Sequence, residues 1–259
     1  MNFLRHFALE HGFEGVDWSF TAESLPRSPG QESAFSKTIA DLYPLEIRYH
    51  CALRNTDLGD LHNEQAKSAL DMFRRACRLV SKLGGHFLTI HVGLGRNTTT
   101  DLSWERTIAR LGDLVRFADN IGVRICLENL AWGWTSRPEL FEKLIRKSGC
   151  SATLDIGHAR ISPSVLSQQY HVEDFVVPHP ERFLNAHIYH EENGEGHIPP
   201  RRLEDLEDRL RLISRLPSCN WWVLELREEK ALLSALRVVR EFMELEFNRS
   251  EVAELPSSS

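Results

Sequence analysis

The sequence predicts a single-domain α/β protein, a TIM-type (β/α) barrel, and three observations support this fold class. Short, mostly continuous apolar runs alternate with amphipathic helical patterns along the chain, which is the signature of βα units and a parallel sheet. The chain has 259 residues, a usual length for one α/β barrel. Chemically active side chains end run after run, as expected where the carboxyl ends of barrel strands converge.

Seven apolar runs are predicted as strands, because runs without polar alternation fit parallel strands covered on both faces. They are residues 15–20, 45–52, 86–93, 123–130, 151–158, 182–190 and 220–227. Apolar side chains at every third or fourth position predict helices over 63–83 and 103–121. Shorter helices are predicted over 137–148 and 203–214, and a final one over 229–245.

The start of the chain departs from a complete barrel. A doubly wound open sheet is the competing architecture, but it usually shows a glycine-rich phosphate loop after its first strand, and the sequence has none. In the barrel, a helix pattern (NFLRHFALEHG) stands where the first strand should be. Either the barrel has seven recognisable strands and a gap, or a strand was lost by truncation or a misplaced start codon; we favour the gap. Residues 1–247 form the predicted barrel, and residues 248–259 a disordered tail.

Composition and charge restrict the class of protein. A formal net charge of −6 argues against binding nucleic acid by bulk electrostatics, which needs basic surfaces. The five cysteines are scattered and form no CxxC pair, so we expect reduced thiols rather than a disulfide framework or a zinc knuckle. No apolar stretch approaches the roughly 18 residues of a membrane span, and no signal peptide precedes the first helix. We therefore expect a cytoplasmic protein without membrane association.

Four side chains at the ends of predicted strands form a candidate metal site. RICLENL carries Glu128, TLDIGH carries Asp155, LNAHIYH carries His187 and WWVLELRE carries Glu225. Three carboxylates and one imidazole suit Mn²⁺, Co²⁺ or Mg²⁺, since a structural zinc site would be richer in sulfur. Without a cation, three facing carboxylates would repel one another. The alternative for each acid alone is a helix cap or a surface ion pair, which accounts poorly for all four together.

The order and spacing of four motifs resemble the xylose-isomerase-like barrels. These motifs are LEN at 127–129, LDIGH at 154–158, AHIYH…GHIPP at 186–200 and LELRE at 224–228. The superfamily includes sugar phosphate isomerases and epimerases, inosose dehydratases, hydroxypyruvate isomerases and apurinic endonucleases of the endonuclease IV type. The resemblance covers residues 8–245 and lacks only the first strand. It is specific for the superfamily and not for one member.

The resemblance implies that Glu128, Asp155, His187 and Glu225 ligate a divalent metal. In the isomerase and epimerase members, the two glutamates also move protons on either face of the substrate, which implies catalytic roles for Glu128 and Glu225. A metal-bound 2-hydroxy ketone suits this chemistry, because its polarised carbonyl makes the neighbouring C–H acidic. His158 would then reach a substrate hydroxyl, and the alternative is a hydrogen-bonding loop residue.

Further side chains offer a second metal site or substrate contacts. His50 and His91 end IRYH and LTIH, where the endonuclease type has two further ligands. Glu195 and His197 in GEGHIPP resemble its Asp-x-His pair, with glutamate in place of aspartate. Together with His158 they resemble a trinuclear site, which would hold Zn²⁺ in an endonuclease-like protein. Several sugar isomerase relatives keep histidines at these places too, so substrate contact stays open.

Aromatic and basic side chains near the predicted mouth are candidates for substrate binding. Trp18 ends the first predicted strand and Trp132 follows the LEN motif, and such rings can stack on a sugar or cyclitol. Arg160 and Arg227 follow candidate ligands and could pair with a substrate phosphate or carboxylate. The alternatives are loop packing for the tryptophans and surface salt bridges for the arginines.

The leading interpretation is a divalent-metal-dependent isomerase or epimerase of a small sugar, sugar phosphate or polyol ketone. Three alternatives stay open: an endonuclease IV-like phosphodiesterase acting at abasic sites, a dehydratase (lyase) of a cyclitol or hydroxy acid, and a barrel that binds a metabolite without turnover. We expect a small carbohydrate as the partner. An uncovered sheet edge would also favour a homo-oligomer.

Overall fold

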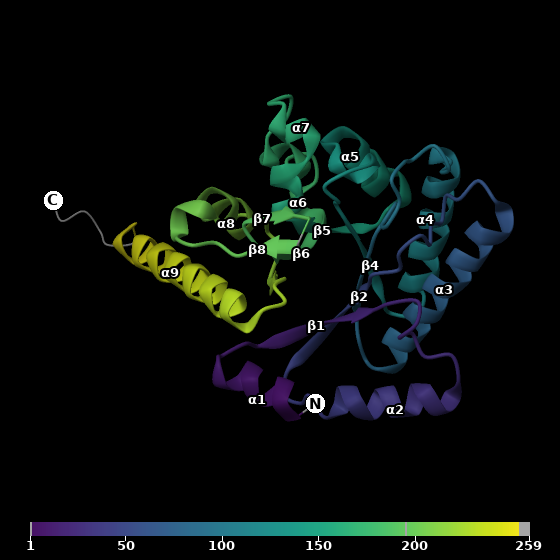
Figure 1. Cartoon of the computed structure of the whole chain (residues 1–259), viewed down its shortest axis with the longest axis horizontal. Coiled ribbons are helices and arrows are strands. Elements are labelled where there is room, and N and C mark those ends of the chain that lie inside the picture. The colour runs from purple at the N-terminus through teal and green to yellow at the C-terminus, as the bar shows by residue number, and fades with distance from the viewer. Residues whose placement is uncertain (1, 195, 254–259) are drawn as a thin grey trace.

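Seven parallel strands form one sheet that curves into a nearly closed barrel, so the predicted TIM-type fold is confirmed (Figure 1). The computed structural model describes residues 2–194 and 196–253. The strands follow one another around the sheet in the order β1-β2-β3-β4-β5-β6-β9. Their bounds are β1 Gly15–Phe20, β2 Glu46–Cys51, β3 Phe87–Ile90, β4 Arg124–Glu128, β5 Ser151–Asp155, β6 Phe183–Ile188 and β9 Trp221–Leu224.

The barrel has a seam between β1 and β9, where the described strands are not paired with each other. At the amino-terminal ends of these strands, the Trp221 ring lies against Gly15, and a Cβ on Gly15 would stand only 2.2 Å from that ring. The guanidinium of Arg48 lies 4.7 Å from the centre of the same indole and 4.1 Å from that of Phe87. Arg48 also donates to the Leu184 carbonyl. Side chains therefore fill the floor of the barrel where a complete wall would have a strand.

Helices between the strands cover the outside of the barrel. The main ones are α1 Asn2–Glu10, α2 Pro29–Ala40, α3 Asn63–Lys82, α4 Trp104–Asp119, α5 Pro138–Ser148, α8 Glu207–Ser214 and α9 Glu229–Ala253. The apolar faces of α3, α4 and α5 bury Phe73, Leu111 and Phe141 against the sheet. Full burial of such a side chain stabilises the folded state by about 1.5–3 kcal/mol. Because each helix buries one face, its apolar residues follow the helical period, and the pattern predicts the helix.

Several segments differ from the sequence prediction. Helix α2 follows Ser28, whose hydroxyl caps its first turn, but it buries none of its residues, so it carries no clear apolar period. The strand predicted over 151–158 ends at Asp155, and α6 (Ile156–Ile161) begins at once, followed by α7 (Pro163–Leu166). The GEGHIPP region contributes to an antiparallel hairpin of β7 (Glu191–Asn193) and β8 (Gly196–Ile198). Helix α9 continues to Ala253, past the predicted end of the barrel at residue 247.

Short 3-10 turns complete the connections: η1 Trp134–Ser136, η2 Val172–Phe175, η3 Pro180–Arg182 and η4 Leu203–Asp205. The helix predicted over 203–214 is therefore a 3-10 turn followed by α8. Among the described residues, no helix combines the length and apolar character needed to cross a bilayer.

Candidate metal centre

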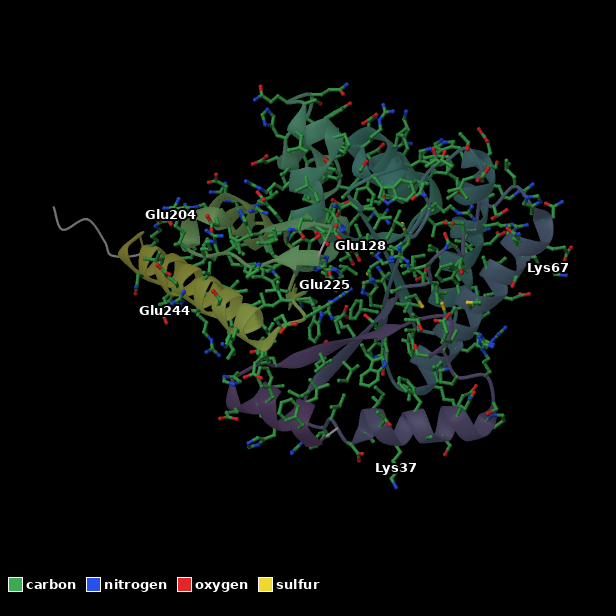
Figure 2. All side chains as sticks on the ribbon, in the orientation of Figure 1. Lys37, Lys67, Glu128, Glu204, Glu225 and Glu244 are labelled. Carbon is green, nitrogen blue, oxygen red and sulfur yellow. The ribbon has the colours of Figure 1, made fainter. Side chains whose placement is uncertain are left out.

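The carboxyl ends of six strands bring the predicted ligands together, as expected for a barrel. Glu128 and Asp155 are the last residues of β4 and β5, and His187 lies near the end of β6. Glu225 directly follows β9 and is still hydrogen-bonded to β6, because its backbone N–H donates to the Ile188 carbonyl at 3.2 Å. Figure 2 shows Glu128 and Glu225 inside the molecule, whereas Lys37, Lys67 and Glu244 lie at its periphery.

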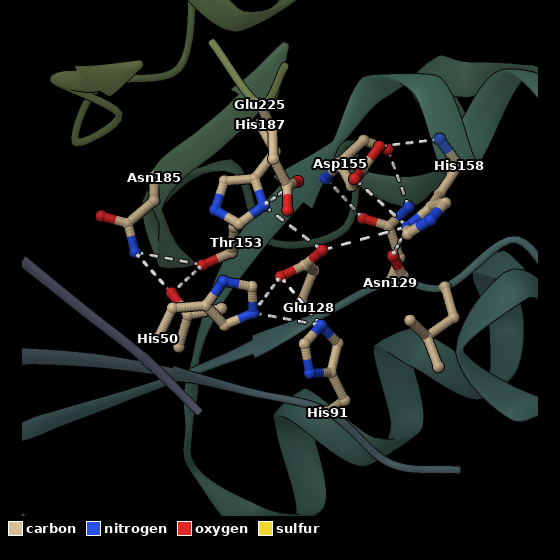
Figure 3. Close-up of polar contacts among 12 residues, drawn as sticks. His50, His91, Glu128, Asn129, Thr153, Asp155, His158, Asn185, His187 and Glu225 are labelled. Carbon is tan, nitrogen blue, oxygen red and sulfur yellow. Dashed lines mark hydrogen bonds and ion pairs between the residues drawn. The ribbon is translucent and has the colours of Figure 1, made fainter. Parts of the chain in front are cut away.

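The central group consists of Glu128, Asp155, His187 and Glu225, whose potential ligand atoms all lie within 4.8 Å of one another (Figure 3). Nδ1 of His187 lies 3.3 Å from a Glu128 oxygen and 3.2 Å from a Glu225 oxygen. The Glu128 side chain is 1% exposed, whereas that of Glu225 is 34% exposed. Glu225 therefore faces the mouth, and Glu128 forms the bottom of the group.

Asp155 is held in place by three partners. The Asn129 side chain accepts from the backbone N–H of Asp155 at 2.8 Å and donates to its carbonyl at 2.9 Å. The Asp155 carboxylate accepts from the His158 backbone N–H at 2.7 Å and from the Tyr189 hydroxyl at 3.0 Å. Asn129 and Tyr189 are not in the predicted site, although both stand inside the motifs that define it. These bonds fix the carboxylate before any ligand arrives.

Burial and mutual attraction set the charges of the central group. Burial raises the pKa of Asp155 to about 6. Burial alone would raise the pKa of Glu128 and lower that of His187, but their mutual attraction reverses both shifts. The same histidine lowers the pKa of Glu225 to about 2, against the effect of burial. In the metal-free site, the positive charge on His187 therefore offsets the charges of the two glutamates, as a bound cation would.

A second group, His50, His91 and Glu128, shares its carboxylate with the central group. The Nε2 atoms of the two histidines lie 3.2 Å apart, and Glu128 Oε2 lies 3.4 Å from His50 and 3.2 Å from His91. Burial lowers the pKa of His50 to about 4, so the ring is neutral at pH 7 and can offer a lone pair.

The donor atoms fit a divalent cation. Glu128 Oε2 and both ring nitrogens of His187 are buried without a hydrogen-bond partner in the described part of the chain. Their contacts are ion pairs of 3.2–3.7 Å, and a bound metal would give these atoms closer partners. Neither the central nor the second group contains sulfur, which favours a hard or borderline cation.

A third group combines His158, Glu192 and His197. His158 Nε2 lies 3.1 Å from one Glu192 oxygen, and His197 Nε2 lies 3.9 Å from the other. The His197 ring stacks on that of Tyr189, with centroids 3.7 Å apart. Burial lowers the pKa of His158, but Asp155 and Glu192 outweigh it and raise the pKa to about 10. Glu192 was not predicted, and the predicted Glu195 lies outside the described residues.

The predicted substrate residues lie in four different environments. Trp18 points away from the barrel interior and packs against Phe35 of α2, so its placement at the mouth is wrong. Strand alternation explains this, because the neighbouring residue of β1 faces inward. Trp132 lies over Gly93, in the loop after β3. Arg160 pairs with Glu191 of the hairpin at 2.9 Å, and Arg227 is exposed.

Asp17 of β1 is the inward neighbour of Trp18 and joins the site without having been predicted. Its Oδ2 atom lies 3.8 Å from His50 Nδ1 and 3.7 Å from His187 Nε2. Burial, reinforced by Glu225 and Glu128, raises the pKa of Asp17 to about 6 despite the opposing effect of His187. A signal was available in the sequence, since a lone acid in the apolar run GVDWSF needs a partner inside the barrel.

Comparison of the sequence with known proteins identifies its family. The sequence matches the family model described as "Xylose isomerase-like TIM barrel" over residues 6–242. An uncharacterized protein, MJ0008 of Methanocaldococcus jannaschii, is 28% identical over 165 residues, which are 62% of this chain and 69% of that protein.

Two solved structures share the fold with this chain. A D-tagatose 3-epimerase-like protein aligns with a TM-score of 0.71 and 17% identity, covering 95% of this chain and 94% of its own. Endonuclease IV of Thermus thermophilus aligns with a TM-score of 0.64 and 21% identity, covering 93% of both chains. At such identities the structural likeness establishes the fold alone. Because the family model covers most of the sequence, the chain belongs to the xylose isomerase-like TIM barrel family.

Proposed function

We propose that the protein is a divalent-metal-dependent isomerase or epimerase of a small sugar, sugar phosphate or polyol ketone. The observation that carries this proposal is the pair of carboxylates, Glu128 and Glu225, whose oxygens lie 3.3 and 3.2 Å from the same ring nitrogen of His187, Nδ1. Glu128, Asp155, His187 and Glu225 would hold the metal, and Mn²⁺, Co²⁺ or Mg²⁺ suits their oxygen-rich set. The bound cation would supply a Lewis acid that polarises a substrate carbonyl.

Glu128 and Glu225 would then move the proton at the carbon next to that carbonyl. Because a third of the Glu225 side chain is exposed, it can approach a substrate from the mouth, while the buried Glu128 approaches from below. With a pKa raised to about 10, His158 carries a proton on both ring nitrogens at pH 7, and it stands between Asp155 and Glu192, where it can donate to a substrate hydroxyl. A general acid or base placed in this way contributes roughly 10²–10⁴-fold to a rate.

A phosphodiesterase of the endonuclease IV type is the second candidate, and the group of His50, His91 and Glu128 favours it. This group shares one carboxylate with the central group, as a site with two cations would require. Zn²⁺ would be the expected metal in that case. The formal net charge of −6 opposes the candidate, because a DNA backbone binds basic surfaces. A dehydratase would use the same proton abstraction, followed by loss of hydroxide.

Solvent exchange tests the proposal without knowledge of the natural substrate. The protein, loaded with Mn²⁺, is incubated in D₂O with a panel of ketoses and cyclitol ketones, and deuterium at the carbon next to the carbonyl is measured by NMR. We expect exchange in at least one ketose, with an isomer or epimer as product. Elimination products would identify a dehydratase, and cleavage of abasic DNA a phosphodiesterase. A protein that binds no metal and exchanges no proton would contradict the proposal and favour a barrel without turnover.

A further inference from the structure

We propose that Asp17 is a positioning residue that fixes the tautomers of two imidazoles, His50 and His187, so that each presents a lone pair to a metal. The inference rests on the proposed function, in which His187 is a metal ligand, and on the second group, in which His50 would be a ligand of a further metal. It assigns a role in the site to β1, the strand at the seam of the barrel.

The contacts around the two rings carry the inference. Nε2 of His187 faces Asp17 at 3.7 Å, and its Nδ1 faces Glu128 and Glu225. His50 has the reverse arrangement, with Nδ1 facing Asp17 at 3.8 Å and Nε2 facing Glu128 at 3.4 Å. For each ring, Asp17 thus faces the nitrogen opposite the one that faces Glu128.

A neutral imidazole has one N–H and one lone pair, so the acceptor behind the ring decides which nitrogen can ligate. Carboxylates often fill this position behind metal-bound histidines, and their loss typically weakens metal affinity 10–100-fold. Asp17 has two oxygens and can accept from both rings at once. The present distances are less than about 1 Å longer than a hydrogen bond, so a small movement on metal binding would complete both contacts.

The surroundings of Asp17 leave it free for this role. Its side chain is 7% exposed, and within the described residues its ion pairs are with His50 and His187. The nearby guanidinium of Arg48 is engaged elsewhere: it donates to the Leu184 carbonyl at 3.2 Å and to the Asn220 side chain at 3.0 Å. A buried carboxylate needs a partner, and the two imidazoles are its partners here.

Asp17→Asn is the informative substitution, because asparagine keeps the size of the side chain but replaces one accepting oxygen with a donor. Asp119→Asn is the control: this acid is about half exposed and pairs with Arg124 on the outer surface. Two measurements are made on each protein. Competition with a chelator gives the Mn²⁺ affinity, and long-range ¹H–¹⁵N NMR of the Zn²⁺-loaded protein identifies the protonated ring nitrogens.

We expect Asp17→Asn to weaken Mn²⁺ binding 10–100-fold and to alter the ¹⁵N shifts of His50 and His187, with neither change in Asp119→Asn. Unchanged affinity and unchanged tautomers would overturn the inference. Loss of one bound metal equivalent with unchanged tautomers would also overturn it, because Asp17 would then be a ligand itself. If the wild type binds no metal, the proposed function fails. The tautomer of His50 in the metal-free protein then still decides the role of Asp17: Nδ1–H in the wild type and its loss in Asp17→Asn support the inference, and no change refutes it.

Discussion

Replacing Glu128 with glutamine should abolish most of the stability that a divalent metal gives to the folded protein. Glu128 is shared by the central and second ligand groups, and its side chain is 1% exposed, so water cannot replace it as a ligand. At a metal concentration about 1,000 times the dissociation constant, binding stabilises the folded state by about 4 kcal/mol. For a chain of this size, 1 kcal/mol shifts the melting temperature by roughly 2–4 °C. The wild type should therefore gain roughly 8–16 °C from Mn²⁺.

Glutamine offers one neutral oxygen in place of a charged carboxylate. If affinity falls about 100-fold, the same metal concentration gives only about 1.4 kcal/mol. The assay is thermal unfolding with Mn²⁺ and with a chelator, and each variant is compared with its own metal-free form. This removes the separate cost of leaving His187 unpaired. Glu32→Gln, on an exposed ion pair with Lys82, is the matched control. A wild-type shift retained in Glu128→Gln would refute the assignment of Glu128 as a ligand.

Three further substitutions test separate features. Glu225→Gln should lower the rate of deuterium exchange into a reactive ketose by at least about 100-fold. The control is Glu228→Gln, on an exposed residue, which should leave this rate unchanged. If Glu225→Gln exchanges deuterium as fast as the wild type, Glu225 does not transfer the proton. In the metal-free protein, the raised pKa of His158, about 10 against 6.5, stabilises the fold below pH 6.5 and loses this effect as the pH rises to 10. Between pH 6.5 and 10, the difference in unfolding free energy between wild type and His158→Gln should therefore shrink by up to about 1.4 kcal/mol per pH unit. The measurement is urea unfolding of both proteins across this range, and a difference that does not change with pH would contradict the prediction. Arg48→Met should lower the free energy of unfolding by about 3 kcal/mol, because the Leu184 carbonyl and the Asn220 side chain lose their donor. The measurement is urea unfolding, and an unchanged midpoint would show that the barrel floor does not depend on Arg48.

The sequence predicted the parts of the fold that have one buried face. The patterns of α3 and α4 follow the helical period because these helices press one side against the sheet. Helix α2 was missed for the opposite reason, since it buries no residue. Its signals, Ser28 as the cap and proline in the first turn, are local ones.

The central ligands were predictable because the end of a parallel strand is a fixed place in a barrel. Residues whose position depends on which face of a strand they occupy, or on a hairpin, could not be predicted in this way. Trp18 and Asp17 are neighbours, and only the alternation of β1 decides which one enters the site. Glu192 reaches His158 through a hairpin that was not predicted from the sequence, although Asn193–Gly194 at its turn is a typical hairpin signal.

The seam between β1 and β9 has a consequence for motion. Strands at an unpaired edge lose their backbone hydrogen bonds more readily than strands flanked on both sides, so their amides should exchange with solvent faster than those of β4. Asp17 lies on β1 at one edge of this seam, and Glu225 follows β9 at the other edge. A metal bound in the site would therefore hold the β1 and β9 edges together. The backbone amides of β1 should then exchange more slowly with the metal than without it, although β1 carries none of the proposed ligands.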